Sequence, residues 1–197
     1  MATRRRKRSY QFKPDRTGTG FLKKLYLTKK QRLTLAKWSF YALTCLLALV
    51  VQDVIMSQVR IFGATTDLAV CAILLITVLE GSEKGSLFAL IASTLYVFAG
   101  TAPGSYAIAF ITIYGVLAAL FREGVWRRGL SSTVLCAGVA MLLYEISVFS
   151  TGIFLGLTLW RRFFIFVLTG AISSLVMLPL YPIVFKIGSI GGEPWKE

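Results

Sequence analysis

A long uncharged stretch near the middle of the chain restricts its possible folds more than any other feature. Residues 85–121 are 37 consecutive positions without a charged side chain, whereas one membrane-crossing helix needs only about 20 apolar residues. The sequence Gly100-Thr-Ala-Pro-Gly104 interrupts this stretch, and Pro together with Gly favours a turn there. A water-soluble domain could not bury so much continuous apolar sequence. The chain is therefore predicted to be an integral membrane protein with several helical spans.

The positive charge of the chain is concentrated at its N-terminus. Residues 1–37 contain 13 of the 22 Lys and Arg and only one acidic residue, Asp15, and the remaining 160 residues are almost neutral. Such a distribution describes a basic tail rather than a nucleic-acid-binding surface. The positive-inside rule places this tail in the cytoplasm, where it is expected to contact anionic lipids. Residues 21–27 are expected to form either a short interfacial helix or part of a solvated tail.

The apolar segments predict an all-α membrane domain with six transmembrane helices and both termini in the cytoplasm. We expect a tail at 1–37, a membrane domain at 38–186 and a C-terminal tail at 187–197. The segments are expected at 38–59, 67–79, 85–99, 106–121, 129 to about 152, and 163–185.

The second and third of these segments are short. Their 13–15 residues would reach only about 20–23 Å as helices, whereas the hydrocarbon core is about 30 Å thick. They are therefore expected to recruit flanking residues, thin the bilayer, or end part-way under cover of neighbouring helices. Three pairs of small residues at four-residue spacing favour close helix packing inside the bundle rather than a dimer. These pairs are Ala89/Ser93, Gly115/Ala119 and Gly170/Ser174.

The sequence offers no constellation for catalysis or for a cofactor. Histidine is absent, which excludes Ser-His and Cys-His pairs and removes the commonest metal ligand. No P-loop, no G-x-G-x-x-G motif and no carboxylate-rich metal motif occurs. Cys45, Cys71 and Cys136 all lie in apolar segments and are interpreted as small buried hydrophobic residues. We therefore expect no enzymatic activity, no cofactor and no metal.

A few charged residues within or beside the apolar segments are the candidate functional positions. On insertion scales a charge at mid-membrane depth costs about 2.5–3.5 kcal/mol, so such a side chain usually faces a partner or a cavity. Asp53 and Glu145 either hydrate near the outer headgroups or pair with arginines at the same depth and border a partner-binding surface. The candidates are Asp53, Arg60, Asp67, Glu145, Arg161 and Arg162.

Several sequence features occur in a characteristic order between about residues 38 and 186. They are Arg60-Ile-Phe-Gly63 followed by Asp67-Leu68, the turns at Gly81…Gly85 and Gly100–Gly104, and Arg122 at the end of the fourth segment. This order resembles the rod shape-determining protein MreD family. Near the end of the third segment, where that family commonly carries an Asp, this chain reads Leu95-Tyr96-Val97-Phe98.

This resemblance implies a non-enzymatic subunit of the cell-elongation complex in the bacterial inner membrane. The subunit would scaffold MreC and the peptidoglycan synthases. Its partners would be MreC and, through MreC, the MreB filament, the RodA glycosyltransferase and a class B penicillin-binding protein.

The alternative is the substrate-binding S component of an energy-coupling-factor vitamin transporter. S components are similar in size, have six spans and are thought to share a related fold. The sequence offers few polar groups for a vitamin pocket, and its first span lacks a clear run of Ala at four-residue spacing. A small transporter or channel of another kind is a third possibility.

Overall fold

Six α-helices form the chain in the computed structural model, which describes residues 29–56, 58, 63–125 and 129–190. The all-α fold class is therefore confirmed. A short π-helix, η2 (Gln52–Met56), extends α1, and a 3-10 turn, η3 (Trp160–Arg162), precedes α6. The α-helices are α1 (Lys29–Val51), α2 (Leu68–Glu80), α3 (Ser82–Phe98), α4 (Tyr106–Val125), α5 (Leu130–Phe154) and α6 (Phe163–Gly188).

The helix boundaries differ from the predicted ones mainly at two places. Helix α1 begins at Lys29, inside the segment predicted as tail, because the residues before Trp38 continue the helix beyond the apolar part. Helix α3 begins at Ser82, so the polar loop predicted at 80–84 shortens to Gly81. The predicted interfacial helix at 21–27 lies outside the described residues.

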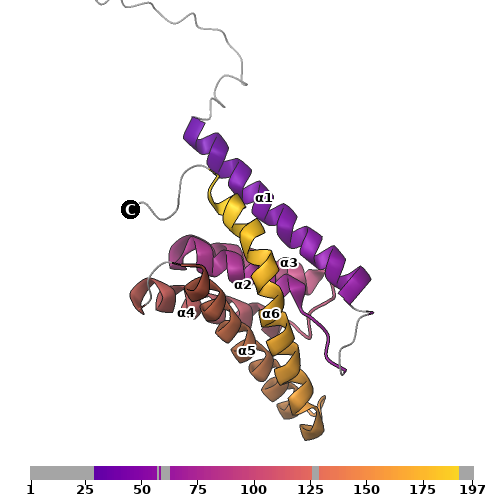
Figure 1. The fold of residues 1–197 in the computed structure, drawn as a ribbon. Helices are drawn as coiled ribbons and strands as arrows, with labels where there is room; N and C mark the ends of the chain where they lie inside the picture. The colour runs from indigo at the N-terminus through magenta and orange to yellow at the C-terminus, as the bar shows by residue number, and fades with distance from the viewer. Residues whose placement is uncertain (1–28, 57, 59–62, 126–128, 191–197) are drawn as a thin grey trace, which may run out of the picture.

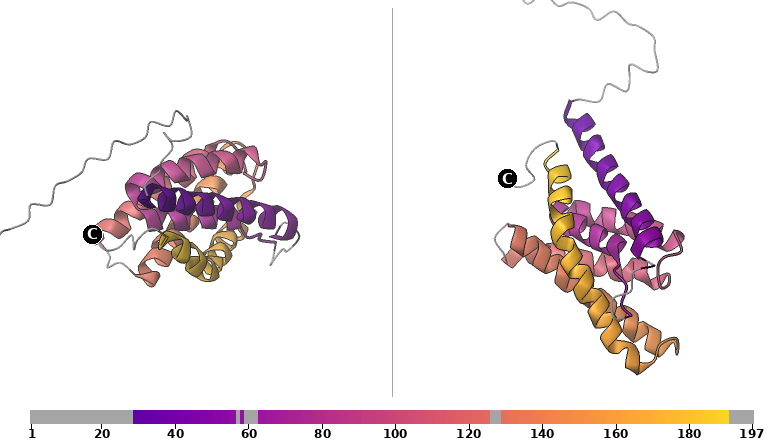
Figure 2. Two further views of the ribbon diagram at one scale, coloured as in Figure 1. Left: turned by 90° about the horizontal axis from the view of Figure 1, so that it is seen from above. Right: turned by 45° about the vertical axis from the view of Figure 1, so that its right-hand side comes forward.

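Helix α2 is the centre of the bundle and contacts each of the other five α-helices (Figures 1 and 2). All residues from Ala69 to Leu79 are buried. Apart from Thr77 and the terminal Glu80, every residue of α2 is apolar, and a helix that is apolar on all sides is stable only when surrounded. The Thr77 hydroxyl is satisfied within the helix, where it donates to the Ile73 carbonyl at 2.7 Å. Among the three expectations for this short segment, the structure favours cover by neighbouring helices.

Two glycines allow the close approach of α2 and α3. Gly81 joins the two helices with a φ of 90°, a backbone conformation that glycine adopts without steric cost. A methyl group at Gly85 would overlap the backbone carbonyl of Thr77. Glycine at position 85 therefore allows the start of α3 to pack directly on the backbone of α2.

The predicted small-residue faces lie at contacts inside the bundle. Ala89, Ser93 and Ala119 are fully buried, and Gly115 faces Thr77 of α2. On α6, the Ser174 hydroxyl lies 3.3 Å from the Gly138 carbonyl of α5. These positions support the interpretation that the small residues serve internal packing.

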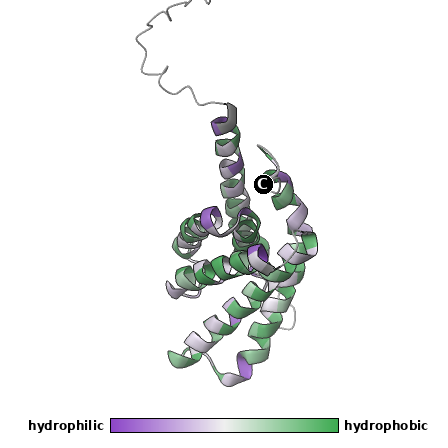
Figure 3. Cartoon of the chain, turned by 90° about the vertical axis from the view of Figure 1, so that its left-hand side faces the viewer, coloured by the Kyte–Doolittle hydropathy of each residue, from purple (hydrophilic) through white to green (hydrophobic). Residues whose placement is uncertain are grey.

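Within the described residues, four helical stretches are long and apolar enough to cross a membrane, as expected for a multi-pass membrane protein. Figure 3 shows hydrophobic residues along most of the helical surface and hydrophilic residues mainly near helix ends. Helix α2 is apolar but shorter than these stretches, and all three cysteines are buried free thiols. The four stretches are Gln31–Met56, Tyr106–Gly124, Leu130–Phe154 and Trp160–Gly188.

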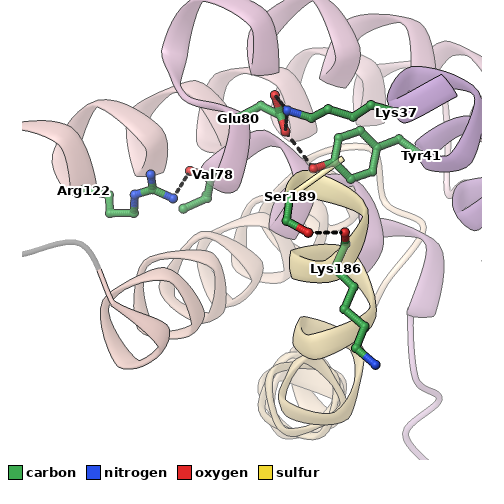
Figure 4. Close-up of polar contacts among 7 residues, drawn as sticks. All are labelled: Lys37, Tyr41, Val78, Glu80, Arg122, Lys186 and Ser189. Carbon is green, nitrogen blue, oxygen red and sulfur yellow. Dashed lines mark hydrogen bonds and ion pairs between the residues drawn. The ribbon is translucent and has the colours of Figure 1, made fainter. Parts of the chain in front are cut away.

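The first half of α1, the end of α2 and the end of α6 meet at one end of the molecule, which we call the ion-paired end (Figure 4). The Lys37 ammonium lies 2.6 Å from the Glu80 carboxylate, and the Tyr41 hydroxyl donates to the same carboxylate at 2.7 Å. A methyl group at Gly188 would lie 2.9 Å from the Tyr41 hydroxyl, which places the end of α6 beside this cluster. Helices α1 and α6 therefore run in opposite directions, and the last turn of α6 lies beside the first half of α1.

Candidate functional site

A polar cavity of about 490 Å³ lies at the end of the bundle opposite the ion-paired end. Its walls come from η2, the segment before α2, the end of α3, the second half of α5 and the start of α6. Parts of the chain that are far apart in sequence thus contribute to one site. Its principal polar lining residues are Gln52, Asp67, Tyr96, Tyr144, Glu145 and Arg162.

Asp67 is the N-cap of α2 and its carboxylate is already engaged. One carboxylate oxygen accepts from the Val70 amide at 3.3 Å and the other from the Tyr96 hydroxyl at 2.7 Å. The Asp67 amide in turn donates to the Ser173 hydroxyl of α6 at 3.0 Å. An N-cap carboxylate satisfies one of the free amides at a helix start and stabilises the helix by about 1 kcal/mol. Asp67 therefore fixes the beginning of the central helix against α3 and α6.

Gln52 completes this arrangement from the other side. Its side-chain oxygen accepts from the Ala69 amide at 2.8 Å, so a second free amide of the first turn of α2 is satisfied. Because Gln52 lies in η2, the contact connects the end of the first long helix to the start of the central one.

Glu145 is a buried acid whose side chain has no partner among the described residues. It is only 5% exposed, and its carboxylate makes no hydrogen bond or ion pair with the residues that the structure describes. The residue lies nine positions before the end of α5, about 14 Å along the helix axis. Its neighbour Tyr144 is 1% exposed, and the Tyr144 hydroxyl also has no hydrogen-bond partner within the described segments. The cavity thus has in its lining an acid without a partner and, next to it in the sequence, a tyrosine whose buried hydroxyl also lacks one.

The structure brings three of the six predicted candidates to this cavity and leaves two others outside it. Arg162 lines the cavity with an exposed side chain, whereas Arg161 and Asp53 are exposed and do not line it. Neither arginine forms an ion pair with Glu145 in the described chain. Arg60 lies outside the described residues. The three residues at the cavity are Asp67, Glu145 and Arg162.

The chain has few polar groups in its apolar segments, but several of them line one cavity. Tyr96 and Tyr144 were not predicted as site residues, because tyrosines in apolar helices commonly face the core or the membrane interface. Tyr96 reaches Asp67 across 29 positions of sequence, a separation that helical periodicity does not reveal. Polar groups that are sparse along the chain are thus concentrated in one place by the fold.

The cavity presents groups that can bind a ligand. Within the described residues, no group of three or more His, Cys, Asp or Glu side chains is arranged to hold a metal ion. What the cavity presents is an acceptor carboxylate, a phenol hydroxyl and aromatic walls, including Phe166. These groups can hold a ligand through hydrogen bonds and charge.

Comparison of the chain with protein-family models, with curated proteins and with solved structures finds no match. The function proposed next therefore depends on the residue contacts described above together with the sequence pattern.

Proposed function

We propose that this chain is a non-enzymatic subunit of the bacterial cell-elongation complex, similar to MreD, and that it scaffolds MreC and the peptidoglycan synthases. The supporting observation is that the residues that resemble the MreD family are also residues that hold α2 in the centre of the bundle. Asp67 caps the helix, and Gly81 and Gly85 allow the tight connection to α3. Arg122, which is 4% exposed, donates to the Val78 carbonyl near the end of α2.

The proposed topology has six crossings of the inner membrane and both termini in the cytoplasm. The meeting of α1 and α6 at the ion-paired end is consistent with an even number of crossings. The basic residues before Trp38 favour the cytoplasmic side for this end. Helix α2 completes its crossing inside the bundle, where its neighbours cover it, and α3 packs beside it with an apolar outer face that lipid would cover. The polar cavity then opens towards the outside of the cell.

The proposed direct partner is MreC, and the contacts with MreB, RodA and a class B penicillin-binding protein are made through MreC. Helix α1 exposes large apolar side chains such as Leu43, Leu47 and Val50 along its length. In a bilayer such a face is covered by lipid or by another helix, and small shape differences decide which. A scaffold subunit requires this kind of surface and no reactive group.

Affinity purification of the tagged chain from its native host in mild detergent tests the proposal. Recovery of MreC together with the elongation synthases supports it. Recovery of an ATPase module in place of MreC contradicts it.

The second candidate, an S component of a vitamin transporter, is favoured by the cavity. Its volume of about 490 Å³ lies in the range of about 300–1,000 Å³ that is usual for small-molecule sites. Its unpartnered Glu145 and Tyr144 would offer orientation to a polar solute. Under this candidate the purification returns the ATPase module, and mass spectrometry detects a vitamin bound to the chain.

A further inference from the structure

We propose that the polar cavity binds a small organic molecule carrying a primary ammonium group, with Glu145 as its main hydrogen-bond acceptor. The inference concerns the cavity itself and is independent of whether the chain acts as an MreD-like scaffold or as a transporter component. The ligand class follows from Glu145 and Tyr144, whose polar groups have no hydrogen-bond partner among the described residues.

The charges in the cavity point to a cation. Asp67 and Glu145 both line the cavity, yet only Asp67 accepts hydrogen bonds from neighbouring groups. An ionised carboxylate that is buried without a partner is costly. A ligand ammonium at Glu145 offsets this cost through charge-assisted hydrogen bonds, which are about twice as strong as neutral ones.

The remaining walls favour an organic cation over a bare metal ion. The described residues provide no cluster of three metal ligands, and a volume of about 490 Å³ exceeds what a single ion fills. Tyr96, Tyr144 and Phe166 line the cavity, and aromatic faces attract ammonium groups. The free hydroxyl of Tyr144 adds a second acceptor in the same region.

Arg162 determines which end of a ligand can lie at the start of α6. Its exposed side chain lines the cavity near the start of α6, whereas Glu145 is buried on α5. A molecule with ammonium groups at both ends would bring its second charge towards this arginine. The site is therefore suited to a ligand whose other end is neutral or anionic.

The test uses the full chain in phosphatidylcholine nanodiscs, because this zwitterionic lipid does not itself attract cations strongly. Isothermal titration compares 4-amino-1-butanol with 1,4-butanediol, two probes of similar size that differ in one terminal group. We expect saturable binding of the amino alcohol and at least tenfold weaker binding of the diol.

The matched variants are Glu145→Gln and Glu83→Gln. We expect Glu145→Gln to weaken binding of the amino alcohol at least tenfold. Glu83 is exposed on α3 and does not line the cavity, so Glu83→Gln should bind as the wild type does. Tyr144→Phe removes the free hydroxyl at nearly constant volume and should weaken binding several-fold. If Glu145→Gln does not elute as a single species and is therefore not properly folded, binding of the amino alcohol to Tyr144→Phe is the deciding measurement.

Three results would overturn the inference: no saturable binding of the amino alcohol to the wild type, equal binding of the two probes, or unchanged binding to a folded Glu145→Gln variant. If the Glu145→Gln variant no longer binds the amino alcohol but still co-purifies with MreC, the ligand site is supported and the scaffold proposal is unaffected. If only the scaffold proposal is wrong, the wild-type chain binds the amino alcohol but does not co-purify with MreC.

Discussion

Glu80 shows how a single side chain connects α2 to α1 at the ion-paired end. Its carboxylate accepts from the Lys37 ammonium and from the Tyr41 hydroxyl, both on α1, at 2.7 Å. The Glu80 side chain is 4% exposed and the Lys37 side chain 13%. Removing one member of a buried ion pair leaves the other charge unpaired and destabilises a protein by about 3–5 kcal/mol.

We therefore expect Glu80→Ala to lower the thermal unfolding midpoint of the purified protein in detergent substantially. The corresponding change at the exposed residue Glu83 should alter stability by no more than about 0.5 kcal/mol. Intrinsic fluorescence reports the transition, because Trp38 packs against Tyr41 with ring centroids 5.8 Å apart. Equal midpoints for the two variants would show that the Lys37–Glu80 pair contributes little.

For individual residues, the sequence indicated two acids that line the cavity, but it did not indicate their hydrogen-bond partners. Asp67 and Glu145 stand out as charges beside or within apolar segments, and both line the cavity. The tyrosine that engages Asp67 is distant in sequence, and the pairing depends on how α3 packs against α2. Such contacts follow from packing and not from local pattern.

Among the helices, α2 is the most completely buried. The sequence predicted a short apolar segment and named cover by neighbours as one way to accommodate it. The burial of every residue from Ala69 to Leu79 depends on close approach by α3, which two glycines permit. The beginning of α1 was missed because the residues before Trp38 are too polar to register as a membrane span, although they still form a helix.

Two glycine substitutions should have opposite effects on stability. Gly85→Ala forces a methyl group against the Thr77 carbonyl, and overpacking of this kind costs about 1–3 kcal/mol. Gly124→Ala places a methyl group in open space on α4, and a compatible Gly→Ala change stabilises by about 0.4–1 kcal/mol. Thermal unfolding of both variants in the same detergent provides the comparison. A Gly85→Ala variant as stable as Gly124→Ala would contradict the described packing of α2 and α3.

In the whole molecule, the ion-paired end and the polar cavity lie at opposite ends of the helix bundle. The sequence predicted six apolar segments in the right order, and these correspond to the six α-helices. It could not predict the cavity, because the cavity exists only where η2, α3, α5 and α6 meet. The proposed topology places this cavity on the outer side of the membrane.

Cysteine labelling tests this orientation. In a background without Cys45, Cys71 and Cys136, which are all buried, we compare two exposed positions. Ser105 lies just before α4 at the cavity end, and Ser189 follows α6 at the ion-paired end. A membrane-impermeant maleimide added outside intact spheroplasts should label Ser105→Cys, and it should label Ser189→Cys only after permeabilisation. The reverse pattern would invert the proposed topology.

Direct binding to MreC tests the central claim most clearly. The tagged chain is co-expressed in a heterologous host with MreC from the same genome, solubilised in mild detergent, affinity-purified and passed over a size-exclusion column. A control co-expresses MreC with an unrelated multi-pass protein carrying the same tag. The account predicts that MreC co-elutes with the chain and is absent from the control. Elution of the chain without MreC, although both proteins are present in the membrane fraction, would contradict it.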